Sequence, residues 1–225
     1  DAAQSVLMYI GVGPPAPKVA PREVRKHLVE AGLLEEEYAK MLEDVIIFRK
    51  QVEHKEVKEI SGKEVDEWIE KSDKYVKRFE KLLSDLEHSR RENDIKRTYE
   101  VMIKASVTAL KSLDKLPKEP EKLPEAFKKY LVDTGLVSSM YADILGKVIG
   151  MRKMVEDKKL DKIADRDIYM SKEYVRRFLI DVKRIIDKSA VNLENLPDIK
   201  MEEAKEIMDT AKDIEKIEKE RLHKK

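Results

Sequence analysis

The chain contains one segment twice. Residues 28–60 return as residues 131–163, displaced by 103 positions without a gap, so that LVEAGLLEEEYAKMLEDVIIFRKQVEHKEVKEI becomes LVDTGLVSSMYADILGKVIGMRKMVEDKKLDKI. Of the 33 aligned pairs, 15 are identical, where roughly two are expected for unrelated segments. Farther along, YVKRF from Tyr75 returns as YVRRF from Tyr174, at a displacement of 99. The duplication predicts two similar units, residues 1–90 and 91–190.

The spacing of apolar residues predicts an all-α fold. In each copy a short helix, opened by a proline and ended by a glycine, precedes a long amphipathic helix over about 34–54 or 137–156. No stretch alternates apolar and polar residues between hairpin turns, so strands are not expected. A fourth helix is predicted over 63–86, because Ser61 and Glu64 form a capping box at its start.

We therefore predict two tandem four-helix units. The first unit is expected to open with a helix over 2–10, and the second with a separate helix over 99–113. The last helix of the second unit follows a loop that ends near residue 165. Residues 191–225 are expected to form one further, charged C-terminal helix.

Composition limits the classes of function. Charged residues make up 41% of the chain but the net charge is only +1, so no overall field attracts nucleic acid. The absence of cysteine excludes disulfides and thiolate metal sites, which favours a cytoplasmic location. The abundance of charge with few Asn and Gln residues is typical of thermophiles. No apolar run reaches the roughly 20 residues of a membrane span, so no membrane partner is expected.

Polar residues at the ends of the two long helices are the candidate functional residues. They are Arg49, Lys50 and His54 in the first copy, and Arg152, Lys153 and Asp157 in the second. An arginine fork suits a phosphate, and a histidine can transfer a proton near neutral pH. Positions five apart on a helix are separated by about 7.5 Å of rise and some 140°, so Arg49 and His54 share a patch only if the helix unwinds before the histidine. The structural alternative is an Arg49–Glu53 ion pair, with His54 as a helix-end cation.

A four-helix unit with Arg-x4-His at the end of its third helix resembles the HEPN family (higher eukaryotes and prokaryotes nucleotide-binding). The resemblance is carried by the first helix DAAQSVLMYIG, the long third helix, the motif RKQVEH and the amphipathic helix that follows. It implies all-helical units that pair so that two Arg/His motifs face each other. In nuclease members this composite site cleaves RNA without a metal. Other members are helical partners of minimal nucleotidyltransferase domains, as in archaeal-type proteins.

The second copy departs from this pattern, because Asp157 stands where the first copy has His54. A composite site of both copies would keep two phosphate-binding arginines and lose half of its proton-transfer capacity. Lys50 also stands where active members often have Asn, Asp or His, and Glu56 stands where some members have a modifiable Tyr. We therefore expect a non-catalytic, nucleotide- or RNA-binding helical module without a cofactor. The resemblance makes it accessory to a nucleotidyltransferase domain, expected before Asp1.

Two alternatives stay open. One is a metal-independent endoribonuclease, in which His54 assists attack of a 2′-hydroxyl on the adjacent phosphate while Arg49 and Arg152 stabilise the developing charge. In that case a homodimer would bring two His54 residues together. The other alternative is a scaffold whose repeats offer a helical docking face to a partner protein.

Overall fold

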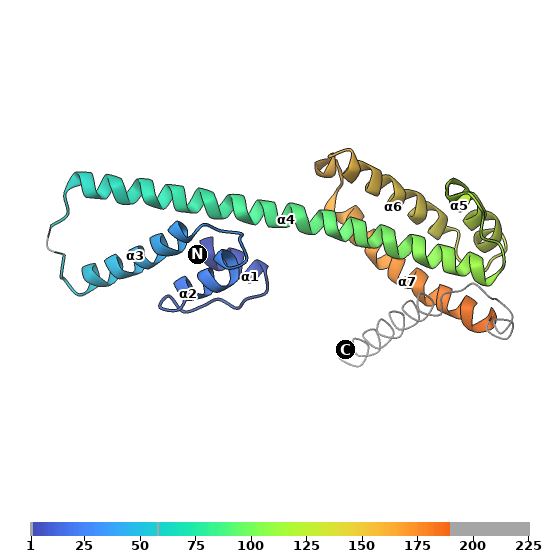
Figure 1. Cartoon of the computed structure of the whole chain (residues 1–225), viewed down its shortest axis with the longest axis horizontal. Coiled ribbons are helices and arrows are strands. Elements are labelled where there is room, and N and C mark those ends of the chain that lie inside the picture. The colour runs from blue at the N-terminus through green and yellow to red at the C-terminus, as the bar shows by residue number, and fades with distance from the viewer. Residues whose placement is uncertain (1, 58, 190–225) are drawn as a thin grey trace. The chain divides into compact units, whose positions relative to one another are not determined.

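The computed structural model describes residues 2–57 and 59–189, and every regular element in them is helical. The helices are α1 (Ala2–Tyr9), α2 (Ala20–Val24), α3 (Glu36–Glu53), α4 (Gly62–Ser112), α5 (Leu123–Phe127), α6 (Met140–Glu156) and α7 (Asp165–Ser189) (Figure 1). Short π-helical turns, η1 (Arg25–Val29) and η3 (Lys128–Val132), continue α2 and α5, and 3₁₀ turns form at η2 (Pro120–Lys122) and η4 (Leu160–Lys162). The all-α prediction is confirmed for these residues. The predicted C-terminal helix over 191–225 lies outside them.

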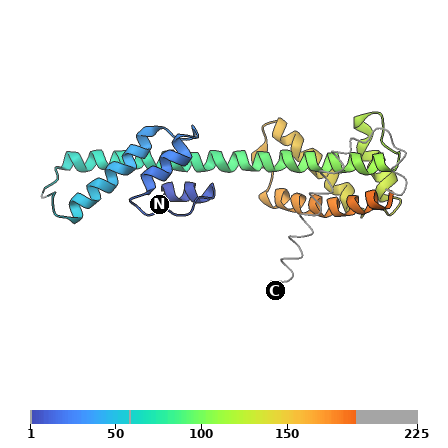
Figure 2. The same ribbon diagram turned by 60° about the horizontal axis from the view of Figure 1, so that its bottom comes forward.

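The chain divides into two compact units between Ser89 and Arg90. Unit 1 holds α1, α2, α3 and the N-terminal part of α4, and unit 2 holds the C-terminal part of α4 with α5, α6 and α7. Each unit has its own hydrophobic core. In unit 2, the α4 segment lies beside α6 and α7 (Figures 1 and 2). None of the helices that the structure describes combines the length and apolar character needed to cross a membrane.

One helix stands where two were expected. We predicted separate helices over 63–86 and 99–113, but α4 runs from Gly62 to Ser112 without a break. The intervening segment HSRRENDIKRTY contains no glycine or proline that would stop a helix. Its charged residues support one instead, as in the ion pair between Lys96 and Glu92 one turn apart. Because the last helix of unit 1 is also the first of unit 2, separately closed four-helix units are not confirmed.

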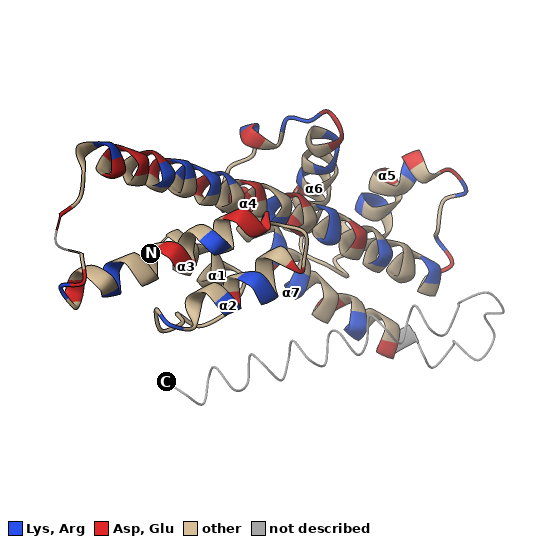
Figure 3. Ribbon diagram, turned by 60° about the vertical axis from the view of Figure 1, so that its left-hand side comes forward, with Lys and Arg blue, Asp and Glu red and all other residues tan. Residues whose placement is uncertain are grey.

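The start of α4 has the predicted capping box. The Glu64 N–H donates to the Ser61 hydroxyl oxygen at 3.2 Å, and the Ser61 N–H donates to the Glu64 carboxylate at 2.9 Å. These bonds satisfy backbone donors that the first turn of a helix otherwise leaves free. Beyond this turn, charges of both signs alternate along α4 (Figure 3).

The backbone repeats along with the sequence. The π-helical turns at 25–29 and 128–132 are 103 residues apart. Every described residue with positive φ has a partner at the same displacement: Gly11 and Asp114, Gly32 and Gly135, Lys55 and Lys158. Gly32 and Gly135 follow the short helices as predicted, at φ 70° and 73°, which glycine adopts without strain.

Matched positions also build part of each core. Eight pairs of apolar residues are buried in both units: Val6 and Ala109, Leu7 and Leu110, Ala20 and Leu123, Val24 and Phe127, Leu28 and Leu131, Leu34 and Val137, Tyr38 and Tyr141, Phe79 and Phe178. In unit 2 the Phe178 ring lies 5.4 Å from that of Phe127 and 5.1 Å from that of Tyr141. The duplicated sequence therefore produces a duplicated core around α1, α2 and the start of α3, together with their counterparts.

Candidate functional site

The predicted Arg49–His54 motif lies at the C-terminal end of α3. His54 is the C-cap residue, and its N–H still donates to the Lys50 carbonyl at 2.8 Å. The chain leaves the helix at Lys55, where φ is 59°. Since the backbone stays helical up to His54, Arg49 and His54 keep the wide angular separation of positions five apart.

Both candidate arginines form an ion pair one turn along their own helix. Arg49 Nε lies 2.7 Å from Glu53 Oε1, and Arg152 Nε lies 2.9 Å from Glu156 Oε1. The two side chains differ in exposure, 73% for Arg49 and 29% for Arg152. In unit 2 the Arg152 guanidinium also lies over the Tyr99 ring, 5.9 Å from the centroid. The structural alternative for the arginines is thus present in both copies.

The remaining candidates lie at the surface of their own units. Lys50 and His54 are exposed in unit 1, and Lys153 and Asp157 are exposed in unit 2. Asp157 pairs with Lys159 at 3.2 Å. A composite site that combines the two copies therefore stays a prediction. Within the described ranges, no three His, Cys, Asp or Glu side chains gather as a metal-binding group.

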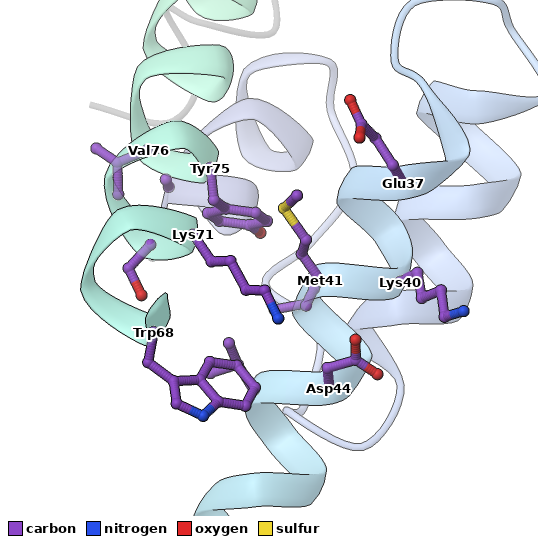
Figure 4. A pocket seen from close by; sticks show the side chains of 12 residues that line it. Glu37, Lys40, Met41, Asp44, Trp68, Lys71, Tyr75 and Val76 are labelled. Carbon is purple, nitrogen blue, oxygen red and sulfur yellow. The ribbon is translucent and has the colours of Figure 1, made fainter. Parts of the chain in front are cut away.

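An apolar groove of about 500 Å³ lies between α3 and α4 in unit 1 (Figure 4). Met41 and Tyr75 point toward each other across it, from α3 and α4 respectively (Figure 4). Trp68 also lines the groove, and its ring stacks on that of Phe48 at 4.7 Å. Charged side chains are part of the lining too, namely Glu37, Lys40, Asp44 and Lys71. The groove is therefore an amphipathic surface with an aromatic centre.

Tyr75, which lines the groove, has a hydroxyl group in an unusual environment. Its oxygen is buried and has no hydrogen-bond partner in the described part of the chain. Burial raises the pKa of the Tyr75 hydroxyl, so the group stays neutral. The ring itself packs on Phe79, with centroids 4.5 Å apart.

Some matched positions of the repeat carry the same apolar residue but are exposed to solvent in unit 1 and buried in unit 2. Four positions carry identical residues in the two copies: Val45 and Val148, Ile60 and Ile163, Ile69 and Ile168, Val76 and Val175. The unit 1 members are between 39% and 61% exposed, whereas those of unit 2 are at most 6% exposed. Sequence alone does not explain this difference, because the residue types are the same.

In unit 2, residues 90–104 of α4 contribute to the core in which these positions are buried. Ile95 and Met102 are fully buried and belong to the same hydrophobic core as the covered residues. Arg91 donates to the Ile163 carbonyl at 2.5 Å, and its Nε lies 2.8 Å from Asp165 Oδ1. On α7, the Lys172 ammonium pairs with Asp94 at 2.9 Å.

Among its described residues, unit 1 has no segment that corresponds to residues 90–104. α1 starts at Ala2, which corresponds to Ala105 of α4 at the displacement of 103. Sequence reasoning missed the groove because apolar residues at helical spacing indicate a core.

In comparisons with known proteins, no protein-family model, no curated protein and no solved structure matches the chain. The resemblance to the HEPN family therefore stays a prediction, carried by the helix plan and the Arg-x4-His motif.

Proposed function

We propose that this chain is a non-catalytic helical docking module, and that the groove of unit 1 binds a partner protein. The observation that carries the proposal is that Val45 and Val76, which line the groove, are each 41% exposed. Their counterparts in unit 2, Val148 and Val175, are at most 3% exposed. Each square ångström of apolar surface that a partner removes from water contributes about 25 cal/mol to the free energy of binding. The exposed apolar residues of the groove therefore favour association with a partner. Exposed contiguous apolar patches with a polar rim mark interaction sites.

The composition of the groove supports binding. Trp68, Tyr75 and Met41 are residue types enriched at the centres of protein interfaces. The hydrophobic core of unit 1 contains residues that are buried at the matched positions of unit 2 as well, including Tyr38 and Phe79. This shared core holds α3 and α4 together and so presents the groove to a partner.

Trp68 provides the test, since it is the only tryptophan of the chain. In the isolated monomer, acrylamide should quench its fluorescence efficiently, and a hydrophobic dye should bind at the groove. Val76→Lys, at an exposed residue that lines the groove, should remove the dye binding, whereas the control Tyr169→Lys, at an exposed residue of unit 2, should not. A Trp68 that is shielded from acrylamide in the monomer would contradict the proposal.

A second candidate function is nucleotide or RNA binding at the end of α3, as the HEPN resemblance implies. Exposure favours it, because Arg49, Lys50 and His54 are all accessible. In this form the module assists a nucleotidyltransferase domain, and Arg152 and Lys153 supply further phosphate contacts. Labelled single-stranded RNA should then bind at low salt, with affinity reduced by Arg49→Ala but not by Arg22→Ala, a change at an exposed arginine elsewhere in unit 1. Equal binding by both variants would contradict this candidate.

The endoribonuclease alternative has its own experiment. End-labelled single-stranded RNA is incubated in excess EDTA with the wild type and with His54→Ala. We expect no cleavage by either protein. Cleavage by the wild type that disappears in the variant would make the chain a ribonuclease and would contradict the non-catalytic proposal.

Several finer predictions belong to the same proposal. Two HEPN-like units of four helices each agree with the matched cores, if α4 is counted in both units. A homodimer that pairs two His54 residues depends on the family resemblance. A cytoplasmic location and a thermophilic, archaeal-type source depend on composition.

A further inference from the structure

We propose that the partner at the groove of unit 1 is a second copy of this chain, with α3 of each copy packed on α4 of the other. The proposal rests on the docking function stated above and names the partner. The observation that carries it is the placement of charge in the groove, because an acid on α3 lies level with a base on α4.

The two helices that form the groove are antiparallel, and two contacts fix their register. Met41 of α3 lies opposite Tyr75 of α4, and the Phe48 ring of α3 stacks on the Trp68 ring of α4 at 4.7 Å (Figure 4). From the first contact to the second, α3 advances by seven residues while α4 goes back by seven. Each position of α3 can therefore be matched with the position of α4 at the same level.

Asp44 and Lys71 lie at one level of the groove. Asp44 follows Met41 by three positions, so it is level with Ser72, the neighbour of Lys71. The Lys71 side chain extends from α4 toward α3, and its ammonium lies 5.2 Å from the centroid of the Trp68 ring (Figure 4). Within the residues that the structure describes, neither Asp44 nor Lys71 has an ion-pair partner. Both charges are thus free to pair with a second molecule.

This placement of charge makes the groove complementary to itself. A twofold axis parallel to the two helices brings α3 of one copy onto α4 of the other and keeps the level of every residue. Asp44 of each copy then faces Lys71 of the other, so the contact gains two identical ion pairs. Such an interface is isologous, because both copies use the same patch.

The same axis brings together the apolar parts of the two grooves. Val45 on α3 and Val76 on α4 are each 41% exposed in the single chain, and the second copy covers both. The lining also holds two acids and two bases, namely Glu37, Asp44, Lys40 and Lys71. Because these charges balance, two copies of the lining meet without a net repulsion.

Sedimentation velocity of the full chain over a range of concentrations tests the second copy. The wild type should dimerise, and acrylamide should quench Trp68 less as the dimer forms. Val76→Lys, in the groove, should abolish the dimer, whereas Tyr169→Lys, at an exposed residue of unit 2, should not. Circular dichroism should show that both variants keep their helices. His54→Ala should also leave the dimer intact, and its loss in this variant would place the contact at the end of α3 and overturn the inference.

An exchange of charges tests the arrangement without an apolar substitution. Asp44→Lys and Lys71→Glu should each weaken the dimer about tenfold, because two attractions become repulsions. An equimolar mixture of the two variants should dimerise as the wild type does. In the mixed dimer the new lysine of one copy faces the new glutamate of the other, and one native pair remains. A mixture that dimerises no better than either variant alone would overturn the inference.

The remaining outcomes separate the second copy from the docking function itself. If the chain is monomeric at all concentrations while Trp68 is accessible, the second copy is wrong and the docking function stands. If a dimer forms that neither Val76→Lys nor the two charge variants weaken, the contact lies outside the groove and the second copy is again wrong. A Trp68 that acrylamide does not reach in the monomer would overturn the docking function as well.

Discussion

Replacing Ile168 with alanine should destabilise the protein far more than the same replacement at Ile69. The two isoleucines occupy matched positions, but Ile168 is 6% exposed and Ile69 is 61% exposed. The substitution removes three carbon atoms from the side chain. At about 0.8 kcal/mol for each buried group, the transfer loss at Ile168 is about 2.4 kcal/mol, and the cavity left behind brings the total to about 3 kcal/mol.

At Ile69 the loss is small, because water already contacts most of the side chain. The covered part loses about 1 kcal/mol of transfer free energy. No closed cavity forms, and the higher helix propensity of alanine returns about 0.4 kcal/mol. The net cost is about 0.5 kcal/mol, so the two variants should differ by about 2.5 kcal/mol in their free energies of unfolding.

Urea denaturation of the full chain measures this difference. Circular dichroism follows all helices, and Trp68 fluorescence follows unit 1. Ile168→Ala should move the transition seen by circular dichroism to lower urea, while Ile69→Ala should barely change the fluorescence transition. Equal, large losses at the two positions would show that Ile69 is covered in solution. Small losses at both would show that Ile168 is not buried in solution, and either result would refute the reasoning.

Three further predictions concern individual side chains. Tyr75→Phe removes a buried hydroxyl without a partner, so thermal unfolding should show unchanged or raised stability, by up to about 1 kcal/mol; a clear loss would reveal a partner for the hydroxyl. Tyr141→Phe removes the 2.9 Å bond to Asp181 and should cost about 1 kcal/mol in the same assay, whereas no loss would mean that water replaces the bond. Hydrogen bonds from the Ser61 N–H and hydroxyl hold the pKa of the Glu64 carboxyl below its ordinary value of 4.5. The ionised Glu64 carboxylate therefore stabilises the folded protein fully above pH 4.5, and this stabilisation is lost as the pH falls through the lowered pKa. The stabilities of the wild type and Glu64→Gln should therefore converge in acid, and a constant gap would contradict the capping role.

Much of the fold could be predicted because its signals are local. The long helix expected over 34–54 is Glu36–Glu53, and that expected over 137–156 is Met140–Glu156. Apolar periodicity and glycine ends mark such spans within a few residues of the chain. The expected break before residue 99 was wrong for the same reason. The repeat suggested a boundary there, but the local sequence has no residue that stops a helix.

The groove could not be predicted, because local sequence does not determine whether an apolar helix face is buried by other parts of the chain. Val45 and Val148 are the same residue in similar local sequence, yet Val45 is 41% exposed and Val148 is fully buried, in a core that includes Ile95 and Met102 of α4. The interpretation of Arg49 has the same difficulty. An arginine four residues before a glutamate is compatible with an ion pair and with a ligand site, and local sequence does not choose between them.

The unbroken α4 changes where the protein can be divided. A cut between Ser89 and Arg90 would follow the boundary of the compact units, yet it would create a new helix end directly before Arg91. The first four N–H groups of a helix lack intrahelical partners, so the turn that carries Arg91 and Asp94 would fray. Those residues tie α4 to Asp165 and Lys172. Domain dissection at this boundary would therefore weaken unit 2, although every residue removed belongs to unit 1.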